Sequence, residues 1–231
     1  MRPPATEKCG YYPTHEHVVE VIKTYIKPPE ERSRLLDPCC GEGTAASILG
    51  NALNCETWGT ELSYKRAALA MNVLDKAYNC AWESAWITQE AVAFLFLNPP
   101  YDSDNIDHKG RLEYQFLKSC TPALAQGGLL CYIVPQLLLG SYDVAKRLAT
   151  YYKNIKVGLY ADSAYKQVVL FATKRDAVHI PEVGEVEQIQ CLATAPIGKL
   201  EPIEAPVYSL LPAPVRGKAG QPITFSRKDW S

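Results

Sequence analysis

The sequence predicts an α/β fold with a doubly wound, mostly parallel sheet, because short apolar runs alternate with segments of helical periodicity. The clearest strand is the run at 91–97, which stops abruptly at Pro99 and Pro100, as a central parallel strand does at a loop. A glycine-containing turn at 41–43 separates an earlier apolar run from a new helix. The chain has 231 residues, which is enough to bury one full-sized core.

The elements follow from the pattern in chain order. Thr14 is a candidate N-cap for the first helix, which we expect to end at Pro28 and Pro29. A late antiparallel hairpin at 155–174 is expected to close the sheet. The remaining expected elements are a strand at 34–37, a helix from Thr44, a strand at 57–62, a helix at 63–78 with Ser63 as its cap, a helix at 112–128 closed by Gly127 and Gly128, a strand at 129–135 and a helix at 142–152.

The character of the chain changes after the expected hairpin. We place the globular domain at 1–178 and a proline-rich extension at 179–231, with prolines at 196, 202, 206, 212, 214 and 222. The alternating stretch at 186–193 is expected to form a strand, and the rest to be extended or disordered, since it is too proline-rich to build its own core. It could wrap the domain, contact a partner, or begin a further region.

Charge and cysteine content exclude several functions. With 24 basic and 25 acidic residues, the chain lacks the basic excess of a tight, unaided duplex-binding protein. Its eight cysteines form no CxxC pair, and His15-Glu16-His17 does not match the HExxH metal motif, so no metal is expected. The start has no apolar signal segment and no apolar run is long enough to span a bilayer, so we expect a reduced, cytoplasmic protein.

The strongest chemical signal is Asn98-Pro99-Pro100-Tyr101 at the carboxyl end of a strand, where ligands bind in open α/β sheets. An aromatic or amide NH2 is a poor nucleophile because its lone pair is delocalised. The side-chain oxygen of Asn98 and the carbonyl of Pro99 could accept hydrogen bonds from that group and orient it. Tyr101 could stack on its plane, and Pro100 would stiffen the loop. The motif therefore predicts methylation of a planar nitrogen.

Two further motifs point to an adenosyl cofactor. The segment 37–44 (DPCCGEGT) places a glycine turn between a strand and a helix, where a ligand approaches the backbone closely. It is not a phosphate-binding Walker loop, because it has no GK[ST]. About twenty residues further on, Glu61 ends the next strand, where a carboxylate could accept hydrogen bonds from both ribose hydroxyls.

DPCCGEGT, GTEL and NPPY, in this order and spacing, resemble the amino-methyltransferase branch of the class I S-adenosylmethionine-dependent enzymes, especially the N6-adenine type. Together with GYYPT at 10–14, LNPPYD and KQVVLF, they also resemble an uncharacterised bacterial family of adenine-methylase-like proteins, over about three quarters of the chain. The resemblance implies a seven-stranded Rossmann-like methyltransferase sheet and S-adenosylmethionine as cofactor.

The same resemblance implies residue roles. The methionine end of the cofactor would lie against Asp37, Gly41 and Gly43, and Glu61 would hold the ribose. The residues expected to bind the cofactor are Tyr12, Thr14, Asp37, Cys39, Gly41, Gly43, Thr44, Glu61 and Glu83, and those expected to hold the acceptor NH2 are Asn98, Pro99, Pro100 and Tyr101.

One departure from the family pattern lies after the expected third strand. The family places an aspartate there against the adenine amino group, whereas this chain has Ala81 or Trp82 at that position. Glu83 or Ser84 could take the role with a small shift, or Trp82 could stack on the ring.

The leading hypothesis is methylation of adenine N6 in DNA or RNA. No target-reading region is evident, which favours single-stranded or structured substrates, or a partner subunit that reads the target. Glutamine methylation on a protein, which needs the same chemistry, and a non-catalytic scaffold are the alternatives. Lys65 and Arg66 are interpreted as a solvated helix face, Lys166 and Gln167 as a strand-edge pair or substrate contact, and the loop 102–113 as a solvated loop or phosphate contact.

Overall fold

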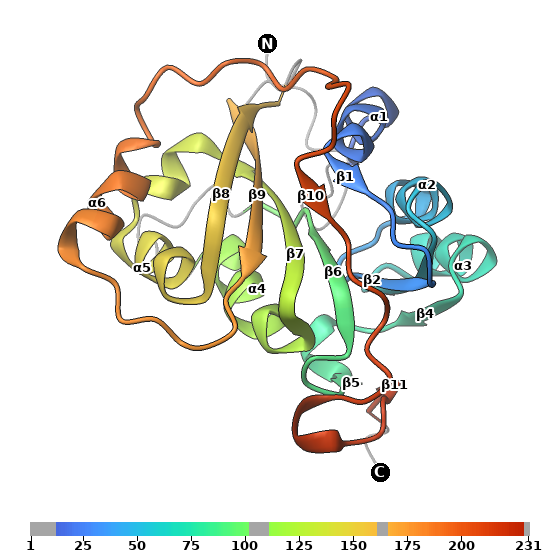
Figure 1. The fold of residues 1–231 in the computed structure, drawn as a ribbon. Helices are drawn as coiled ribbons and strands as arrows, with labels where there is room; N and C mark the ends of the chain where they lie inside the picture. Colours follow the sequence, from blue (N-terminus) through green and yellow to red (C-terminus); the bar gives the residue numbers. More distant parts are fainter. Residues whose placement is uncertain (1–12, 102–110, 161–165, 229–231) are drawn as a thin grey trace.

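The computed structural model describes residues 13–101, 111–160 and 166–228, and its centre is a seven-stranded sheet in the order β4-β3-β2-β6-β7-β9-β8 (Figure 1). Neighbouring strands from β4 to β7 are parallel, whereas β9 is antiparallel to both β7 and β8. The predicted parallel sheet with a terminal antiparallel hairpin is therefore confirmed. The strands are β2 (Ser33–Asp37), β3 (Cys55–Glu61), β4 (Lys76–Asn79), β6 (Val92–Leu97), β7 (Leu124–Pro135), β8 (Tyr152–Leu159) and β9 (Gln167–Lys174).

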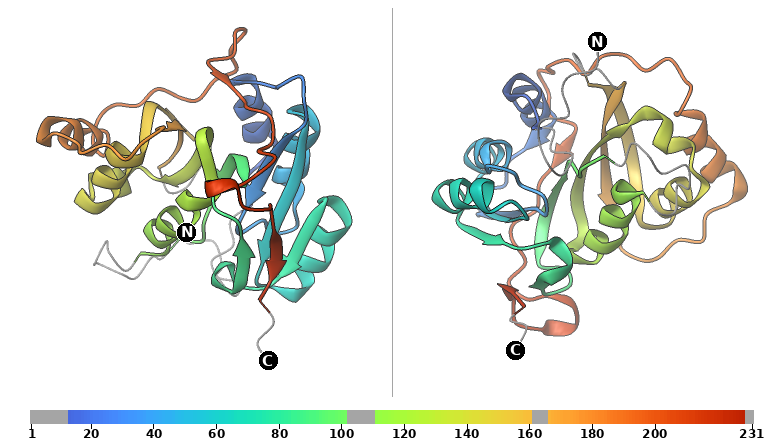
Figure 2. Two further views of the ribbon diagram at one scale, coloured as in Figure 1. Left: turned by 60° about the horizontal axis from the view of Figure 1, so that its bottom comes forward. Right: turned by 180° about the vertical axis from the view of Figure 1, so that it is seen from behind.

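Helices cover both faces of the sheet, as Figure 2 shows from two further directions. One face carries α1 (Glu16–Thr24), α2 (Thr44–Ala52) and α3 (Tyr64–Val73). The other carries α4 (Leu112–Cys120), α5 (Tyr142–Tyr151) and α6 (Val183–Cys191). Short 3-10 turns complete the described structure at η1 (Trp82–Ser84), η2 (Thr121–Ala123), η3 (Gln136–Gly140) and η4 (Lys218–Gly220). No helix in the described ranges has the length and apolar character needed to cross a bilayer.

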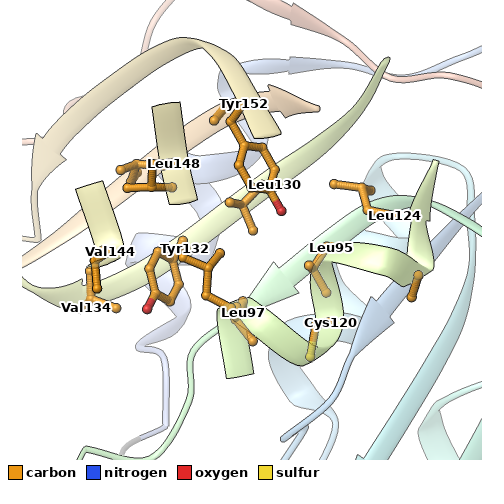
Figure 3. Packing of buried hydrophobic residues seen from close by; sticks show 14 of the residues in the cluster. Leu95, Leu97, Cys120, Leu124, Leu130, Tyr132, Val134, Val144, Leu148 and Tyr152 are labelled. Atoms are coloured by element: carbon orange, nitrogen blue, oxygen red, sulfur yellow. The ribbon is translucent and has the colours of Figure 1, made fainter. Parts of the chain in front are cut away.

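The central strands are apolar throughout because both of their faces are covered. In β6, Leu95 and Leu97 belong to the core on the α4–α5 side, whereas Phe94 and Phe96 point to the α1–α2 side. This alternation is the two-residue period of a strand. Figure 3 shows the first of these cores, in which residues of β6 and β7 pack against Val144 and Leu148 of α5 and against Tyr152 of β8.

Three predicted helices have other boundaries in the structure. The helix predicted at 63–78 ends at Val73, and Lys76–Asn79 pairs with β3 as the strand β4. The first helix begins at Glu16 with His15 as its N-cap, so Thr14 is not the cap, and it ends at Thr24 before a short strand, β1 (Ile26–Lys27). The predicted helix at 112–128 ends at Cys120, and Gly127 and Gly128 lie inside β7 instead of closing it. Leu124 onwards pairs with β6, and this tertiary pairing outweighs the local pattern.

The strand predicted at 186–193 is wrong, because this segment lies mostly in α6. Its start carries a capping box in which the side chains of Glu182 and Glu185 each accept a hydrogen bond from the other's backbone. Val186 and Ile189 are spaced three residues apart, so a helix turns both towards the core beneath α5, where they are buried. The helical spacing of the apolar residues decides the structure, not their apparent alternation.

The rest of the extension wraps the domain, which is one of the arrangements that the sequence left open. After α6 the chain runs beside the end of β8, passes β1 and reaches β5 at the opposite side (Figure 1). In this segment β10 (Tyr208–Ser209) pairs with β1, and β11 (Phe225–Arg227) pairs with β5 (Ala85–Ile87). The ring of Phe225 stacks on Trp58 with centroids 4.9 Å apart. The extension therefore adds to the domain core.

Candidate active site

A cavity of about 850 Å³ lies at the carboxyl ends of β2, β3 and β6. In open α/β sheets this is the edge at which ligands bind. The described lining residues include most of those that the sequence singled out, namely Thr14, Asp37, Cys39, Thr44, Glu61, Glu83, Asn98, Pro100 and Tyr101. The lining within the described ranges does not include Gly41, Gly43 or Pro99.

The Asn98–Tyr101 segment forms one wall of this cavity and is held by a hydrogen bond within itself and by hydrogen bonds to two other parts of the chain. The side-chain amide of Asn98 donates from Nδ2 to Oγ1 of Thr14 at 2.9 Å. The hydroxyl of Tyr101 donates to Oδ1 of Asn98 at 2.8 Å. The side-chain amide of Gln167, at the start of β9, donates to the Tyr101 hydroxyl. The orientation of the Asn98 amide is thus set by residues before α1 and on β9.

Thr14 therefore has a different local role from the predicted one. It does not cap α1, but it ties the segment before that helix to Asn98. The backbone N–H of His15 donates to the hydroxyl of Tyr160 at 3.0 Å, which fixes the same segment beside the end of β8.

Asp37 ends β2 and is nearly fully buried at the cavity wall. Burial raises its pKa to about 7, because removal from water disfavours the charged form. The backbone N–H of Cys39 donates to Asp37 Oδ1 at 3.1 Å, which opposes this rise, and the charge of Glu61 adds to it. A cationic ligand beside Asp37 would restore the ionised form.

Cys39 links this loop to Asn98. Its thiol donates to the backbone carbonyl of Asn98 at 3.2 Å. Burial raises the pKa of the Cys39 thiol well above its usual value, so it is a neutral donor and a poor nucleophile.

The two glycines of the turn have structural tasks. Both have positive φ, 56° at Gly41 and 84° at Gly43, a region that L-residues with a side chain rarely adopt. A Cβ on Gly43 would lie 2.8 Å from Cγ2 of Val73, so this glycine lets α2 begin close against α3. The N–H of Gly41 donates to Oε2 of Glu61 at 3.1 Å, which joins the turn to the next strand.

Arg66 is a site residue that the sequence analysis missed. The sequence predicts a solvated position, but the side chain of Arg66 is only 14% exposed and lines the cavity. Its guanidinium donates to Oε1 of Glu61, with Nη2 at 2.8 Å and Nε at 3.2 Å. The backbone N–H of Ser63 donates to the same oxygen at 2.7 Å. The sequence does hold a signal for this ion pair. Arg66 lies five positions after the carboxylate of Glu61 at the end of a strand, in the first turn of the next helix.

The segment that departs from the family pattern forms another wall. Glu83 lies at the cavity and is exposed, whereas Trp82 is buried with its indole N–H donating to the hydroxyl of Ser119 at 2.9 Å. Leu112 and Phe116 of α4 also line the cavity and were not predicted. Their apolar side chains form, with Trp82, a surface suited to a flat ring.

Some predicted features lie outside the described residues. These are Tyr12 and residues 102–110 of the loop after Tyr101. The His15–Glu16–His17 segment lies at the start of α1. No group of three or more His, Cys, Asp or Glu side chains suited to a metal occurs among the residues described. The rings of His15 and His17 stack with centroids 5.7 Å apart.

The sequence matches the model of the uncharacterised methyltransferase family DUF6094 over residues 5–212, nearly the whole chain. The chain belongs to this family. It is therefore a methyltransferase, and the motifs at Asp37–Thr44 and Asn98–Tyr101 lie in the matched region. No curated protein matches the sequence.

Solved structures support the fold independently. A methyltransferase from Pyrococcus furiosus matches with a TM-score of 0.53 and 16% identity, over 69% of this chain and 82% of that one. The methyltransferase subunit of a type I restriction-modification system from Streptococcus thermophilus matches with a TM-score of 0.58 and 15% identity, over 82% of this chain and 54% of that one. At these identities the likeness shows a shared methyltransferase fold.

Proposed function

We propose that this methyltransferase uses S-adenosylmethionine to methylate a planar NH2 group, with adenine N6 in DNA or RNA as the leading acceptor. The observation that carries the proposal is the hydrogen-bonded placement of Asn98 and Tyr101 at the cavity wall. An amide oxygen can accept two hydrogen bonds, so the bond from Tyr101 does not by itself prevent Asn98 from accepting one from a substrate. The aromatic ring of Tyr101 lies at the same cavity.

The residues present fit this cofactor. The cavity volume of about 850 Å³ is within the range of small-molecule sites. The buried carboxyl of Asp37 would pair with the cofactor's ammonium, and Glu61, held by Arg66, would accept hydrogen bonds from the ribose hydroxyls. The apolar wall of Trp82, Leu112 and Phe116 would take the adenine ring. Bound there, the cofactor would supply a methyl group activated by a sulfonium.

The chain's own residues would then act by positioning. The Asn98 amide oxygen would accept a hydrogen bond from the acceptor NH2 and hold its nitrogen in line with the methyl. The Pro99 carbonyl was predicted to share this role, but Pro99 is not among the described lining residues. The bond to Asn98 would favour the tetrahedral nitrogen that forms as the new N–C bond grows and the S–C bond breaks. The excess proton on nitrogen would leave to solvent after transfer. No general base of tuned pKa is needed for this step.

A glutamine side chain on a protein is the second candidate acceptor, because its amide NH2 suits the same chemistry. The charge of the cavity favours it. Among the described residues that line the cavity, five have carboxyl side chains and one, Arg66, is an arginine or lysine. The five acidic residues are Glu16, Asp37, Glu42, Glu61 and Glu83. Such a lining suits a cationic cofactor but repels a phosphate backbone.

If the acceptor is a base in a duplex, it must leave the stack, at a cost of a few kcal/mol. The chain's balanced charge supplies little phosphate binding to offset that cost. We therefore propose a single-stranded or structured nucleic acid, or a partner subunit that reads the target. The similarity to a methyltransferase subunit of a restriction-modification system is consistent with the latter.

The test is transfer of labelled methyl from S-adenosylmethionine to single- and double-stranded DNA, to RNA and to a protein lysate. We expect label on adenine with the wild type and none with Asn98→Ala. Asn72→Ala is the matched control, since Asn72 is exposed on α3, away from the residues that line the cavity in the described structure, and its amide donates to the carbonyl of Ala68. Label on protein that survives nuclease would select glutamine instead, and a folded protein that does not bind the cofactor would support a scaffold role.

A further inference from the structure

We propose that Gln167 is a positioning residue for methyl transfer, which acts through Tyr101 to fix the direction of the Asn98 amide. Gln167 is not among the residues that line the cavity in the described structure, and its side chain is 7% exposed. Its contact with the site is the hydrogen bond from Nε2 to the hydroxyl of Tyr101. The inference rests on the proposed function where it is tested by enzyme kinetics. It does not rest on that function where it is tested by spectroscopy of the ligand-free protein.

The direction of this hydrogen-bond chain follows from donor and acceptor chemistry. An amide N–H of Gln167 can only donate, so the oxygen of Tyr101 accepts from it. The single O–H of Tyr101 then donates to Oδ1 of Asn98, and Nδ2 of Asn98 donates to Thr14. Burial raises the pKa of Tyr101, so its hydroxyl keeps the proton that this chain requires.

The consequence concerns the two ends of the Asn98 amide, which are alike in size and opposite in chemistry. An acceptor NH2 needs the amide oxygen, and a flipped amide would present an NH2 to it instead. Thr14 does not set the direction alone, because its hydroxyl can donate as well as accept. In this structure Gln167 presents its Nε2 to Tyr101, and this donor sets the direction that Thr14 leaves open.

The backbone around Gln167 is built to aim this side chain. Lys166, which precedes it, has a φ of 45°, a strained value for a residue with a side chain. Its carbonyl accepts from the N–H of Gln136 at 2.9 Å, and the carbonyl of Gln167 accepts from the N–H of Tyr160 at 2.9 Å. Strain of this kind persists where the surrounding structure enforces it, and it gathers at functional positions.

Gln167→Glu tests the polarity because it keeps the shape and replaces the donor by an acceptor. The introduced carboxylate would accept the Tyr101 O–H, so the Asn98 oxygen would lose the hydrogen bond from Tyr101 that favours the present direction of its amide. We expect kcat to fall by about tenfold or more, with little change in cofactor affinity. The ratio of variant to wild-type kcat should rise as the pH falls, since the introduced carboxyl donates again once it is protonated.

Two comparisons separate positioning from a general structural effect. Gln190→Glu makes the same change in a half-buried glutamine that donates to the carbonyl of Gly140, and it should leave kcat unchanged. In a Tyr101→Phe background, Gln167→Glu should cause no further loss of kcat, because the hydroxyl through which it acts is absent. An equal loss in both backgrounds overturns the proposal. If Gln167→Glu does not fold, Gln167→Met removes the donor without adding a charge.

A readout without turnover keeps the two proposals distinguishable. The side-chain amide signals of Asn98, assigned by their loss in Asn98→Ala, can be followed by nuclear magnetic resonance in the ligand-free protein. We expect them to shift in Gln167→Glu and to stay in place in Gln190→Glu. Unchanged signals in Gln167→Glu overturn the positioning role even if methyl transfer is established. Shifted signals with no methyl transfer by the wild type would uphold the control of the Asn98 amide by Gln167 and refute the proposed function.

Discussion

The buried carboxyl of Asp37 makes cofactor binding depend on pH. In the ligand-free protein its pKa is raised from 3.8 to about 7, so at pH 5.5 most molecules carry a neutral Asp37. A ligand whose ammonium pairs with Asp37 requires the carboxylate, so binding releases a proton and is favoured by rising pH. With the bound carboxyl ionised throughout, the apparent Kd should fall by about 20-fold between pH 5.5 and pH 7.5.

The assay is calorimetric titration with S-adenosylhomocysteine, which has the same amino-acid end and does not react. Asp37→Asn should bind more weakly at pH 7.5 and lose most of the pH dependence. Glu42→Gln is the control, because Glu42 is an exposed carboxyl of the same loop and its loss should leave the slope unchanged. A slope that persists in Asp37→Asn, or a flat wild-type profile, would refute the assignment of Asp37 to the ammonium.

The same shift predicts the stability of the ligand-free protein. The pKa of Asp37 is higher in the folded protein than in the unfolded chain. Its contribution to the free energy of unfolding is therefore fully present below pH 3.8 and is lost as the pH rises to about 7. The difference of about three pKa units corresponds to a loss of stability of the order of 4 kcal/mol. Asp37→Asn should therefore raise the Tm at pH 8 and have a smaller effect at pH 4.

Three further predictions concern the rest of the site and the extension. Arg66→Gln should weaken cofactor binding several-fold, because Glu61 loses the guanidinium that holds it. Lys65→Gln, on the exposed side of α3, should leave binding unchanged, and equal titration curves for the two variants would contradict the role of Arg66. Gly43→Ala should destabilise the fold by about 1–3 kcal/mol in urea denaturation, from its φ of 84° and the contact with α3; an unchanged midpoint would show that the turn relaxes freely. Phe225→Ala should lower the free energy of unfolding by about 3 kcal/mol in urea denaturation, because its stacking on Trp58 anchors β11. An unchanged free energy of unfolding would mean that the extension does not stabilise the domain.

Local patterns were sufficient to predict most strands of the sheet and the edge at which the cavity lies. The strands β2, β3, β6, β7 and β9 are apolar runs that end in turns, and such runs have few alternatives once helices alternate with them. The cavity position followed as well, because parallel strands bring their carboxyl ends to one edge. For this reason Asp37, Glu61 and Asn98, which are far apart in the chain, were expected at one site and line one cavity.

Two of the errors share a physical cause, since each concerns a segment whose structure depends on a distant partner. Gly127 and Gly128 look like a helix end, but strand pairing with β6 recruits the segment around them. Arg66 looks like a solvated residue until β3 places Glu61 beside it.

The sequence by itself determined the fold class, the methyltransferase motifs and the chemistry open to Asn98, because periodicity and side-chain type are local properties. Only the tertiary structure decided the direction of the Asn98 amide and the partner of Glu61. It also decided the path of the extension around the domain. These features depend on hydrogen bonds and packing between residues far apart in the chain, such as Gln167 with Tyr101 or Phe225 with Trp58. No local pattern encodes which of many polar or aromatic side chains will meet.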